Sequence, residues 1–296
     1  MKDIALGFVG QGWIGKNYAD HYEDRGFSVV RYSQELSYSS NRDKIKNCDI
    51  VFIAVPTPST PEGFDDSIVR EVVSLVAKGK IAIIKSTIIP GTTRSIQEEN
   101  PDIFVFHSPE FLREASARED VDNPDRNIVG IARDNKATCA AAEKALSVMP
   151  KAPYQKICKA EEAELVKYGN NVFLFLKVIY ANIFHDVATH YGADWSTVAD
   201  AIAADPRIGT SHMNPVHASG HTDKKGRGAG GHCFIKDFAA FHDFYKRTVN
   251  DEFGLKVLEA LRDDNIHLLT STDKDLDLLE DVYGDLIRQN TFKKKI

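Results

Sequence analysis

Residues 4–15 have the sequence IALGFVGQGWIG, a short apolar run followed by a turn with three glycines. The run Ile4–Val9 predicts a buried strand, and the pattern of Lys16–Arg25 predicts a helix after it. In such a turn the first glycine permits the tight bend, the second lets a phosphate approach the backbone, and the third allows close packing of helix on sheet. The free N–H groups at the helix start attract anions. The stretch therefore predicts a dinucleotide site at Gly10, Gln11, Gly12, Trp13, Ile14 and Gly15.

Further short runs rich in Ile and Val follow along the first half of the chain. They predict strands at Ser28–Tyr32, Ile50–Val55, Ile81–Lys85, Ile103–Phe106, Asn127–Ile131 and Tyr154–Cys158. Helical patterns such as Asp66–Lys78 lie between several of them. Alternating strands and helices form right-handed units with a parallel sheet. We therefore expect an α/β protein whose N-terminal part is a Rossmann-like parallel sheet with helices on both faces.

The second half changes character near Ala160. Glu161–His190 predicts one long helix, and its stretch Val172–Phe184 is apolar almost all round, which predicts burial on several sides. Helical patterns return at Asp194–Ala204 and from Phe238 onward. Ile208–Gly231 contains six glycines and one proline and is expected to be a loop. We therefore expect a Rossmann-like NAD(P)-binding domain at residues 1–160 and a mostly helical second domain at residues 161–296.

Composition limits the class of protein. With 296 residues, 43% hydrophobic and 27% charged, the chain is an ordinary globular protein with room for two domains. A net charge of −6 disfavours a nucleic-acid partner, which needs clustered Lys and Arg. The apolar stretch Val172–Phe184 is shorter than the roughly 20 residues of a membrane span, and the N-terminus does not resemble a signal peptide. The four cysteines lack paired spacing, so we expect a reduced, cytoplasmic protein without membrane contact.

The end of the second predicted strand bears on the cofactor. An acidic residue there would bind the ribose hydroxyls of NAD, but the sequence has Ser33, with Arg31 nearby and Glu35 slightly late. A serine and an arginine suit a 2′-phosphate. NAD is the expected cofactor, and NADP stays open.

Cys233 stands out among the cysteines. The glycine pair Gly230 and Gly231 precedes it and would permit close substrate approach, and Lys236 follows near a predicted helix start. Cations and helix N-termini both lower the pKa of a thiol, which makes Cys233 a candidate nucleophile. The other three cysteines are expected to be small hydrophobic residues.

The chain resembles the UDP-glucose/GDP-mannose dehydrogenase family, and most closely its UDP-glucose 6-dehydrogenases. The motifs that carry the resemblance occur in family order over residues 4–240. They are the turn Gly10–Gly15, then Ala54–Pro58, Lys85–Thr93, Ser108–Glu114, Ala163–Tyr168 with Asn171, Asp205–Gly209 and the loop Gly230–Asp237.

The resemblance implies the chemistry of the family, which is oxidation of the C6 alcohol of a nucleotide sugar to a carboxylate by two hydride transfers. It implies that Cys233 forms a thiohemiacetal and then a thioester. Lys167 and Asn171, one helical turn apart, would stabilise the oxyanion. Glu114 would act as general acid and base through a water that Thr87 helps to hold, and Asp237 would orient the lysine or water.

The resemblance also implies binding residues and an oligomer. Besides the glycine turn, the cofactor would contact Ser33, Val55, Pro56, Thr57, Thr87 and Lys236. The nucleotide-sugar substrate would contact Glu110, Phe111, Leu112, Arg113, Glu114, Lys167, Asn171, Gly230 and Gly231. Arg207 would reach the substrate of a neighbouring subunit in a homodimer.

Three features depart from the family pattern. Ile235 replaces the usual proline of the cysteine motif. His212, His217, His221 and His232 cluster before and beside Cys233, but their irregular spacing favours a flexible substrate-covering loop over a zinc site, so no metal is expected. After Val257–Leu269, where a dimer helix would begin, the family continues into a third domain, whereas Asp273–Ile296 is short and charged. An NAD(P)-dependent two-electron β-hydroxyacid dehydrogenase and a non-catalytic nucleotide-binding protein therefore remain alternatives.

Overall fold

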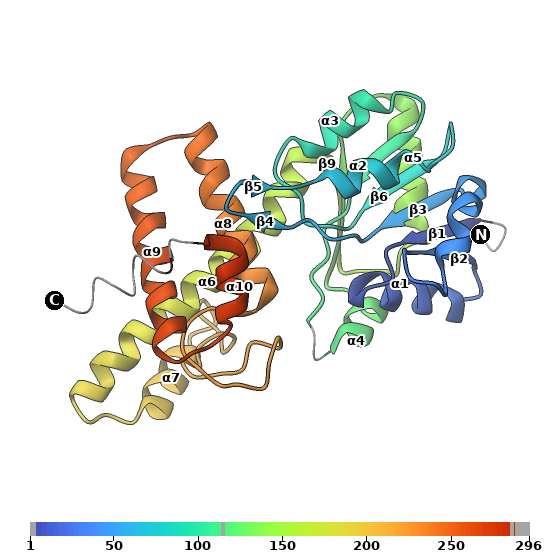
Figure 1. Ribbon diagram of the computed structural model, residues 1–296. Coiled ribbons are helices and arrows are strands. Elements are labelled where there is room, and N and C mark those ends of the chain that lie inside the picture. The colour runs from blue at the N-terminus through green and yellow to red at the C-terminus, as the bar shows by residue number, and fades with distance from the viewer. Residues whose placement is uncertain (1–3, 114–115, 285–286, 288–296) are drawn as a thin grey trace. The chain divides into compact units, whose positions relative to one another are not determined.

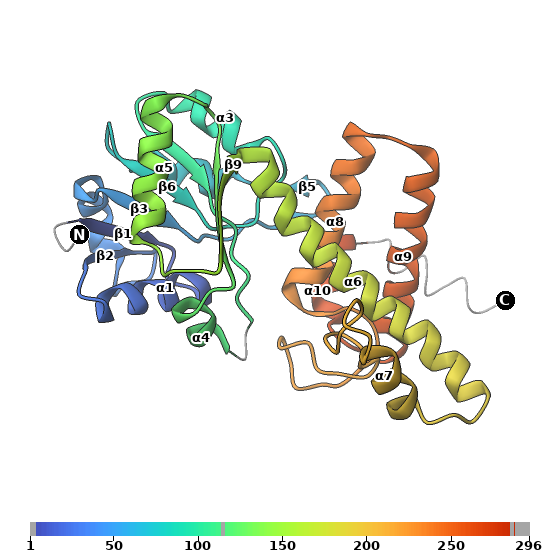
Figure 2. The ribbon, with the colours of Figure 1, turned by 180° about the vertical axis from the view of Figure 1, so that it is seen from behind.

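The computed structural model describes residues 4–113, 116–284 and 287. The chain forms two compact units. The first combines residues 1–58 with 65–167, and the second combines residues 59–64 with 168–296. The long helix α6 (Ala160–His190) contributes to both. Figures 1 and 2 show the elements from opposite sides.

The first unit contains a sheet of seven strands in the order β2-β1-β3-β6-β7-β8-β9. Their bounds are Ser28–Tyr32, Ala5–Val9, Ile50–Ile53, Ile81–Ile84, Phe104–His107, Arg126–Ile131 and Tyr154–Lys159. The first five strands run parallel, which confirms the expected α/β fold class. The prediction of a wholly parallel sheet was wrong at one edge, because β8 runs antiparallel to β7 and β9 follows β8 in parallel.

Helices cover both faces of this sheet, which explains its near-continuous apolar strands (Figures 1 and 2). On one face, alternate residues such as Leu6 and Phe8 of β1 form a core with α1 (Trp13–Asp24) and α5 (Lys136–Val148). The rings of Phe8 and Phe52 stack there at 5.0 Å. On the other side α2 (Ser67–Val73) lies against β3 and α3 (Thr92–Glu99) against β7. The 3₁₀ helix η1 (Ser39–Asn47) and α4 (Ala117–Asp122) complete this unit.

A small hairpin leaves the first unit after residue 58. Its strands β4 (Ser59–Thr60) and β5 (Gly63–Phe64) pair antiparallel and belong to the second compact unit. There Ser59 Oγ donates to the carbonyl of Lys236 at 3.3 Å. The sequence did not predict this hairpin, because two-residue strands are too short for a periodic signal.

The second unit is built from helices. They are the C-terminal part of α6, α7 (Trp195–Ala203), α8 (Gly231–Thr248), α9 (Glu252–Ser271) and α10 (Leu276–Tyr283). Phe175 of α6 stacks on Phe238 of α8 at 4.1 Å in the core that these helices share with Leu268 of α9. Helix α8 begins seven residues before Phe238, the position from which the sequence predicted a helix.

One prediction about α6 was wrong. The stretch Val172–Phe184 was expected to be buried on several sides, yet Phe173 is 58% exposed and Phe184 is 41% exposed. Among the described residues, α6 is the one helix whose length and composition would suit a membrane span, a test that core helices of soluble proteins also meet.

Candidate active site

The glycine turn follows the predicted geometry. Gly10 has φ +89°, and a Cβ on it would lie 2.1 Å from the carbonyl oxygen of Ala54. A Cβ on Gly15 would lie 1.9 Å from the carbonyl oxygen of Gly10, so the helix can approach only if this residue is glycine. At Gly12 a Cβ would meet nothing within 4 Å, and no side chain caps α1 there. The start of α1 thus presents N–H groups toward open space, as anion binding requires.

The sheet brings other predicted cofactor residues to the same edge. Strand β1 lies between β2 and β3, so the order of strands reverses beside it, where α/β sheets bind ligands beyond their carboxyl ends. After β3, the Val55 N–H donates to Ser86 Oγ at 3.0 Å, and Thr57 Oγ1 donates to the Thr87 carbonyl at 2.8 Å. These bonds join the segments that follow β3 and β6. Pro56 between them is exposed.

The end of β2 differs from a phosphate-binding site. Arg31 Nη2 lies 2.7 Å from Asp20 Oδ1 and 2.6 Å from Glu23 Oε2, and both carboxylates project from α1. The guanidinium is therefore already neutralised by the protein. Ser33 Oγ accepts the N–H of Glu35 at 3.3 Å. Gln11 is buried and donates to the carbonyls of Phe8 and Gly10, so its side chain holds the turn.

Lys167 and Glu110 form a buried ion pair in the first unit. Lys167 Nζ lies 2.9 Å from both Glu110 Oε1 and the Glu110 carbonyl oxygen, and both side chains are 6% exposed. Glu110 Oε2 accepts the N–H of Leu112 at 2.8 Å. The pair fixes the segment after β7 against α6. The sequence predicted both residues but not their contact, which connects positions 57 residues apart.

Two buried groups beneath this segment were not predicted. Lys85 Nζ donates to Ser108 Oγ at 2.9 Å and lies 4.9 Å from the centre of the Tyr18 ring. Burial lowers the pKa of Lys85 to about 8, with Glu110 opposing the shift. Burial, and then Lys85, lower the pKa of His107 to about 3, so its ring is neutral. Their place in the motifs Lys85–Thr93 and Ser108–Glu114 was the available signal.

The remaining residues of the segment after β7 point to different partners. Arg126 Cζ lies 3.6 Å from the centre of the Phe111 ring, and Arg113, which is exposed, pairs with Asp120 at 2.5 Å. Glu114, the predicted general acid and base, lies outside the described residues.

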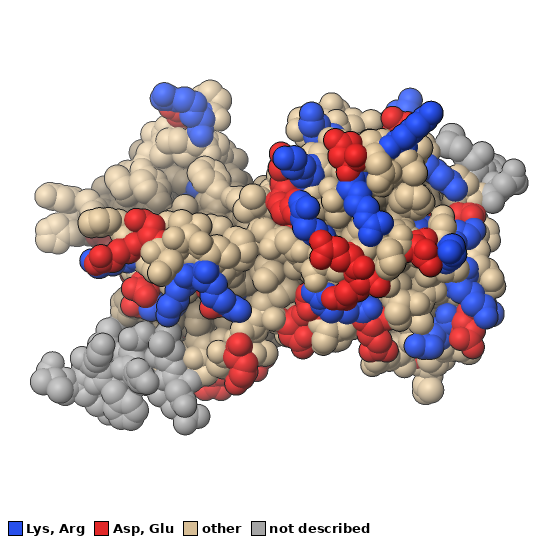
Figure 3. Space-filling view, turned by 90° about the horizontal axis from the view of Figure 1, so that it is seen from above, with Lys and Arg blue, Asp and Glu red and all other residues tan. Residues whose placement is uncertain are grey.

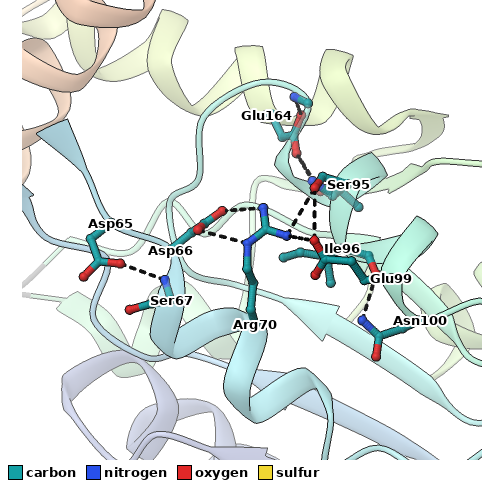
Figure 4. Close-up of polar contacts among 11 residues, drawn as sticks. Asp65, Asp66, Ser67, Arg70, Ser95, Ile96, Glu99, Asn100 and Glu164 are labelled. Atoms are coloured by element: carbon teal, nitrogen blue, oxygen red, sulfur yellow. Dashed lines mark hydrogen bonds and ion pairs between the residues drawn. The ribbon is translucent and has the colours of Figure 1, made fainter.

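Helix α3 also begins after a glycine, and here a side chain occupies its start (Figure 4). Glu164, fully buried on α6, accepts the N–H groups of Gly91 at 2.7 Å and Thr93 at 2.8 Å, and the Thr93 hydroxyl at 2.6 Å. Burial raises the pKa of Glu164 to about 7 despite these donors. Arg70 of α2 binds Asp66 on one side and Ser95 and Glu99 of α3 on the other.

Cys233 lies in the first turn of α8 and is exposed. One turn further, Asp237 is 1% exposed and accepts Asn171 Nδ2 at 2.6 Å and Lys236 Nζ at 2.6 Å. The second unit thus brings together four predicted residues, Cys233, Lys236, Asp237 and Asn171, on two adjacent helices. Lys167 belongs to the first unit, although it lies only four residues before Asn171 on the continuous α6.

The glycine pair before Cys233 has a structural reason of its own. A Cβ on Gly230 would lie 2.1 Å from Asp275 Oδ2, and Gly231 has φ +79°. A substrate role for both stays a prediction. Arg207 is 87% exposed and pairs with Asp205 at 2.5 Å, so it extends from the surface of the second unit.

Two of the predicted histidines, His217 and His221, have hydrogen-bond partners other than histidine, and the rings of His221 and His232 lie 4.8 Å apart. His217 Nδ1 lies 2.9 Å from the Asn214 carbonyl oxygen, and His221 Nε2 lies 2.7 Å from Asp277 Oδ2. In the part of the chain that the structure describes, no three His, Cys, Asp or Glu side chains form a group that could hold a metal ion. On the face seen in Figure 3, basic and acidic side chains of the described residues are interspersed.

The two halves of the chain match two different domain models of one known family. Residues 22–146 match the NAD binding domain of the UDP-glucose/GDP-mannose dehydrogenase family, and residues 161–266 match its central domain. The chain belongs to this family.

Individual members of the family are similar over most of the chain. A UDP-glucose 6-dehydrogenase of Rickettsia bellii is 32% identical over 80% of this chain and 54% of its own length. The structure of a UDP-glucose dehydrogenase from Pyrobaculum islandicum is 29% identical and matches with a TM-score of 0.72 over 88% of this chain and 68% of its own. The chain spans about half the length of the Rickettsia relative. A 3-hydroxyisobutyrate dehydrogenase of Mycobacterium tuberculosis shares the fold, with 17% identity and a TM-score of 0.67 over 95% of this chain and 98% of its own.

Proposed function

We propose that this protein oxidises the C6 alcohol of a nucleotide sugar to a carboxylate with NAD, and that UDP-glucose is the substrate. The relatives named as UDP-glucose 6-dehydrogenases support the reaction and the sugar. One observation carries the proposal, which is the exposed Cys233 thiol in the first turn of α8, one turn from the buried Asp237. A simple alcohol dehydrogenase has no use for a thiol there.

The cysteine accounts for four-electron oxidation in balanced steps. The C6 alcohol first loses a proton and a hydride and becomes an aldehyde. The Cys233 thiolate adds to the aldehyde carbon, and the resulting oxyanion takes up a proton to give a thiohemiacetal. This loses a second hydride and a proton to form a thioester. Water then cleaves the carbon–sulfur bond, releasing the carboxylate, the thiolate and two protons. NAD, when bound, supplies the hydride acceptor for both oxidation steps.

The surroundings of Cys233 suit this sequence. The first turn of a helix and a nearby cation both favour a thiolate over a thiol. Asp237 holds the amide of Asn171 and the ammonium of Lys236 in fixed positions, and we expect the second N–H of the Asn171 amide to donate to a developing oxyanion.

Residues of the first unit have complementary proposed roles. The Lys167 ammonium, held by Glu110, would stabilise negative charge on the substrate oxygen. Thr87 would hold a water, and Glu114 would move its proton. Phe111, Leu112 and Arg113 would contact the substrate. Arg207, which belongs to the second unit, would reach the substrate of a neighbouring subunit.

The first unit fits NAD better than NADP. The open start of α1 at Gly12 accommodates a pyrophosphate, which both cofactors share. A 2′-phosphate would need a free cation at the end of β2, but Arg31 is held by Asp20 and Glu23. Two carboxylates beside the ribose would repel the phosphate.

A homodimer is part of the proposal. Large apolar side chains form an exposed stripe along α6 and the residue that follows it, spaced by seven, four, three and four residues, namely Phe173, Tyr180, Phe184, Val187 and Tyr191. Such a stripe indicates an interaction face. A second copy of α6 would cover it, and Phe184→Glu should then convert a dimer to a monomer in light scattering.

A reduced, cytoplasmic location is proposed too, because the Cys233 nucleophile must remain a thiol.

The experiment counts NADH formed for each molecule of acid formed. Purified protein is incubated with UDP-glucose, GDP-mannose or a β-hydroxyacid, each with NAD or NADP. We expect two NADH per acid with UDP-glucose, and no acid from Cys233→Ser, with Cys139→Ser as the matched control. One NADH per turnover with a β-hydroxyacid, unaffected by Cys233→Ser, would contradict the proposal.

A further inference from the structure

The turn between α9 and α10, residues 272–275, contains two buried charges. Lys274 is 0% exposed and Asp275 is 5% exposed, and Asp275 adopts a left-handed backbone with φ +52°. Burying a charge and placing a non-glycine residue in this conformation both cost free energy. The turn is therefore held by specific contacts rather than by its own preference.

Asp275 makes its contacts with the start of α8. Its Oδ2 accepts the N–H of Gly231 at 2.8 Å, and its Oδ1 accepts the hydroxyl of Ser219 at 3.0 Å. The carboxylate occupies the space that a Cβ on Gly230 would need, at 2.1 Å. It thus fixes the residue two positions before Cys233.

The rest of the turn fixes the preceding loop. Lys274 Nζ donates to the carbonyls of Gly228 at 2.9 Å and Gly226 at 3.4 Å. Thr272 Oγ1 accepts the N–H of Arg227 at 3.1 Å. Residues 272–275 therefore bind the backbone along 226–231, and nothing in their sequence marks them as part of a site.

We propose that Asp275 is a positioning residue, which fixes the N-terminus of α8 and so orients the Cys233 thiol for attack. This rests on the proposed function in one respect, the use of Cys233 as nucleophile. Asp275 acts on the thiol in two opposing ways. Its hydrogen bond keeps the first turn of α8 formed, which favours the thiolate, while its negative charge disfavours it.

Other charged groups lie near the same helix start. His232, Lys236 and Asp237 are on α8 itself. Facing it are Lys274 with His217, and His221 with Asp277, whose ring and carboxylate are 2.7 Å apart. None of these residues is substituted in the variants below, and the two Asp275 variants remove the same charge beside Lys274 and His217.

Two variants distinguish the effect of the Asp275 hydrogen bonds from the effect of its negative charge. Asp275→Ala removes both the hydrogen bonds and the charge. Asp275→Asn removes the charge, keeps an acceptor oxygen for the Gly231 N–H, and replaces the acceptor of the Ser219 hydroxyl with an NH2 group that can donate to Ser219 Oγ. Alkylation of Cys233 by iodoacetamide at pH 7.5, followed by mass spectrometry of its peptide, measures thiolate access directly. We expect the rate to fall at least threefold in Asp275→Ala and to stay at or above the wild-type rate in Asp275→Asn.

Turnover gives a second measurement. We expect kcat with UDP-glucose and NAD to fall at least tenfold in Asp275→Ala with KM for NAD within twofold, and to stay within threefold of wild type in Asp275→Asn. Asp273→Ala, at an exposed position of the same turn, is the matched control and should behave as wild type.

Several outcomes would overturn the proposal. These are an alkylation rate in Asp275→Ala that equals or exceeds wild type, or a loss in Asp275→Asn equal to that in Asp275→Ala. If Asp275→Ala does not fold, Ser219→Ala removes the second hydrogen bond of Asp275, together with the acceptor of the His221 N–H, and should lower the alkylation rate about twofold. No change would count against positioning. If no sugar nucleotide is oxidised, the proposed function fails while the alkylation result still decides the role of Asp275.

Discussion

Helices α1 and α8 both begin directly after glycine-rich segments, yet their first turns have opposite surroundings. At α1 the space beside Gly12 is open, and no side chain caps the helix. At α8 the Asp275 carboxylate accepts the Gly231 N–H and fills the space beside Gly230. The first helix start is prepared for an anion from outside, whereas the second is satisfied by an anion of the protein.

The start of helix α3 resembles the start of α8, because a carboxylate of the protein binds its N–H groups. It also follows a glycine, Gly91, which has φ +96°, and N–H groups at its start are satisfied by Glu164 of α6. Glycine before a helix therefore has two uses, which are to admit a ligand or to admit a carboxylate from a distant part of the chain. A ligand site can be inferred only where the structure leaves the helix start open.

The largest expected loss of stability comes from adding a side chain to the glycine turn before α1. Gly10→Ala forces a side chain into a conformation with φ +89° and against the Ala54 carbonyl at 2.1 Å. We expect a loss of about 4 kcal/mol in the free energy of unfolding and a fall of about 10 °C in Tm. Thermal unfolding monitored by circular dichroism measures it.

Gly79→Ala is the matched control for that variant. Gly79 also has positive φ, +76°, but a Cβ there would meet nothing within 4 Å. We expect a loss of about 1 kcal/mol, from backbone strain alone. Equal losses in both variants would show that the Ala54 contact contributes nothing.

The next effect concerns the filled start of α3 and depends on pH. The pKa of Glu164 is raised from 4.5 to about 7 in the folded state, so the folded protein keeps a proton that the unfolded chain releases. Stability from this group is therefore fully present below pH 4.5 and is lost as the pH rises to about 7. Glu164→Gln cannot ionise, so the difference between variant and wild type should move by about 3 kcal/mol in favour of the variant between pH 4.5 and pH 7.5.

Urea unfolding at a series of pH values tests this expectation. Glu161→Gln is the control, because Arg94 lowers the pKa of that carboxylate and its effect should have the opposite sign. Parallel curves for wild type and Glu164→Gln would show that the pKa of Glu164 is the same in the folded and unfolded states.

A smaller effect is expected at the open start of α1. Gly12→Ala adds a methyl group where nothing lies within 4 Å, so we expect a loss of only about 1 kcal/mol in the free energy of unfolding, because alanine is a poorer N-cap than glycine. If the pyrophosphate lies there, Kd for NAD should rise about tenfold, or about 1.4 kcal/mol. Calorimetric titration with NAD measures it, and unchanged affinity would place the cofactor elsewhere.

The smallest effect concerns cofactor choice. Asp20→Asn with Glu23→Gln frees Arg31 from its two carboxylates, and we expect the ratio of NADP to NAD affinity to rise about fivefold, near 1 kcal/mol. Asp24→Asn, whose partner is Arg118, should leave the ratio unchanged. A rise in the control as large as in the double variant would mean that net charge alone explains it.

The sequence predicted what short-range patterns encode. The apolar runs located the seven strands of the large sheet within one or two residues, and the glycine turn was predicted with its geometry. The reversed direction of β8 was missed, because strand direction depends on how the connection crosses the sheet rather than on periodicity. The exposure of Phe173 and Phe184 was missed because an apolar pattern does not say which neighbour covers it.

Contacts between residues far apart in the chain could not be predicted from the sequence, for a related reason. Lys167 with Glu110, Glu164 with the start of α3, and Asp275 with Gly231 each join segments that only folding brings together. The sequence supplied the residue types, and for Lys167 and Glu110 also the motif. For Asp275 it supplied only one acid within a charged C-terminal stretch.

The hairpin of residues 59–64 has a practical consequence for anyone dividing this protein. Because it belongs to the second unit, the polypeptide passes between the units after residues 58, 64 and 167, and neither unit is a continuous piece of chain. A fragment beginning at residue 161 would leave the hairpin behind and expose the surfaces of α8 and α10 that it covers, including the Lys236 carbonyl bound by Ser59. A helical fragment joined to residues 59–64 by an engineered linker would keep its own core whole.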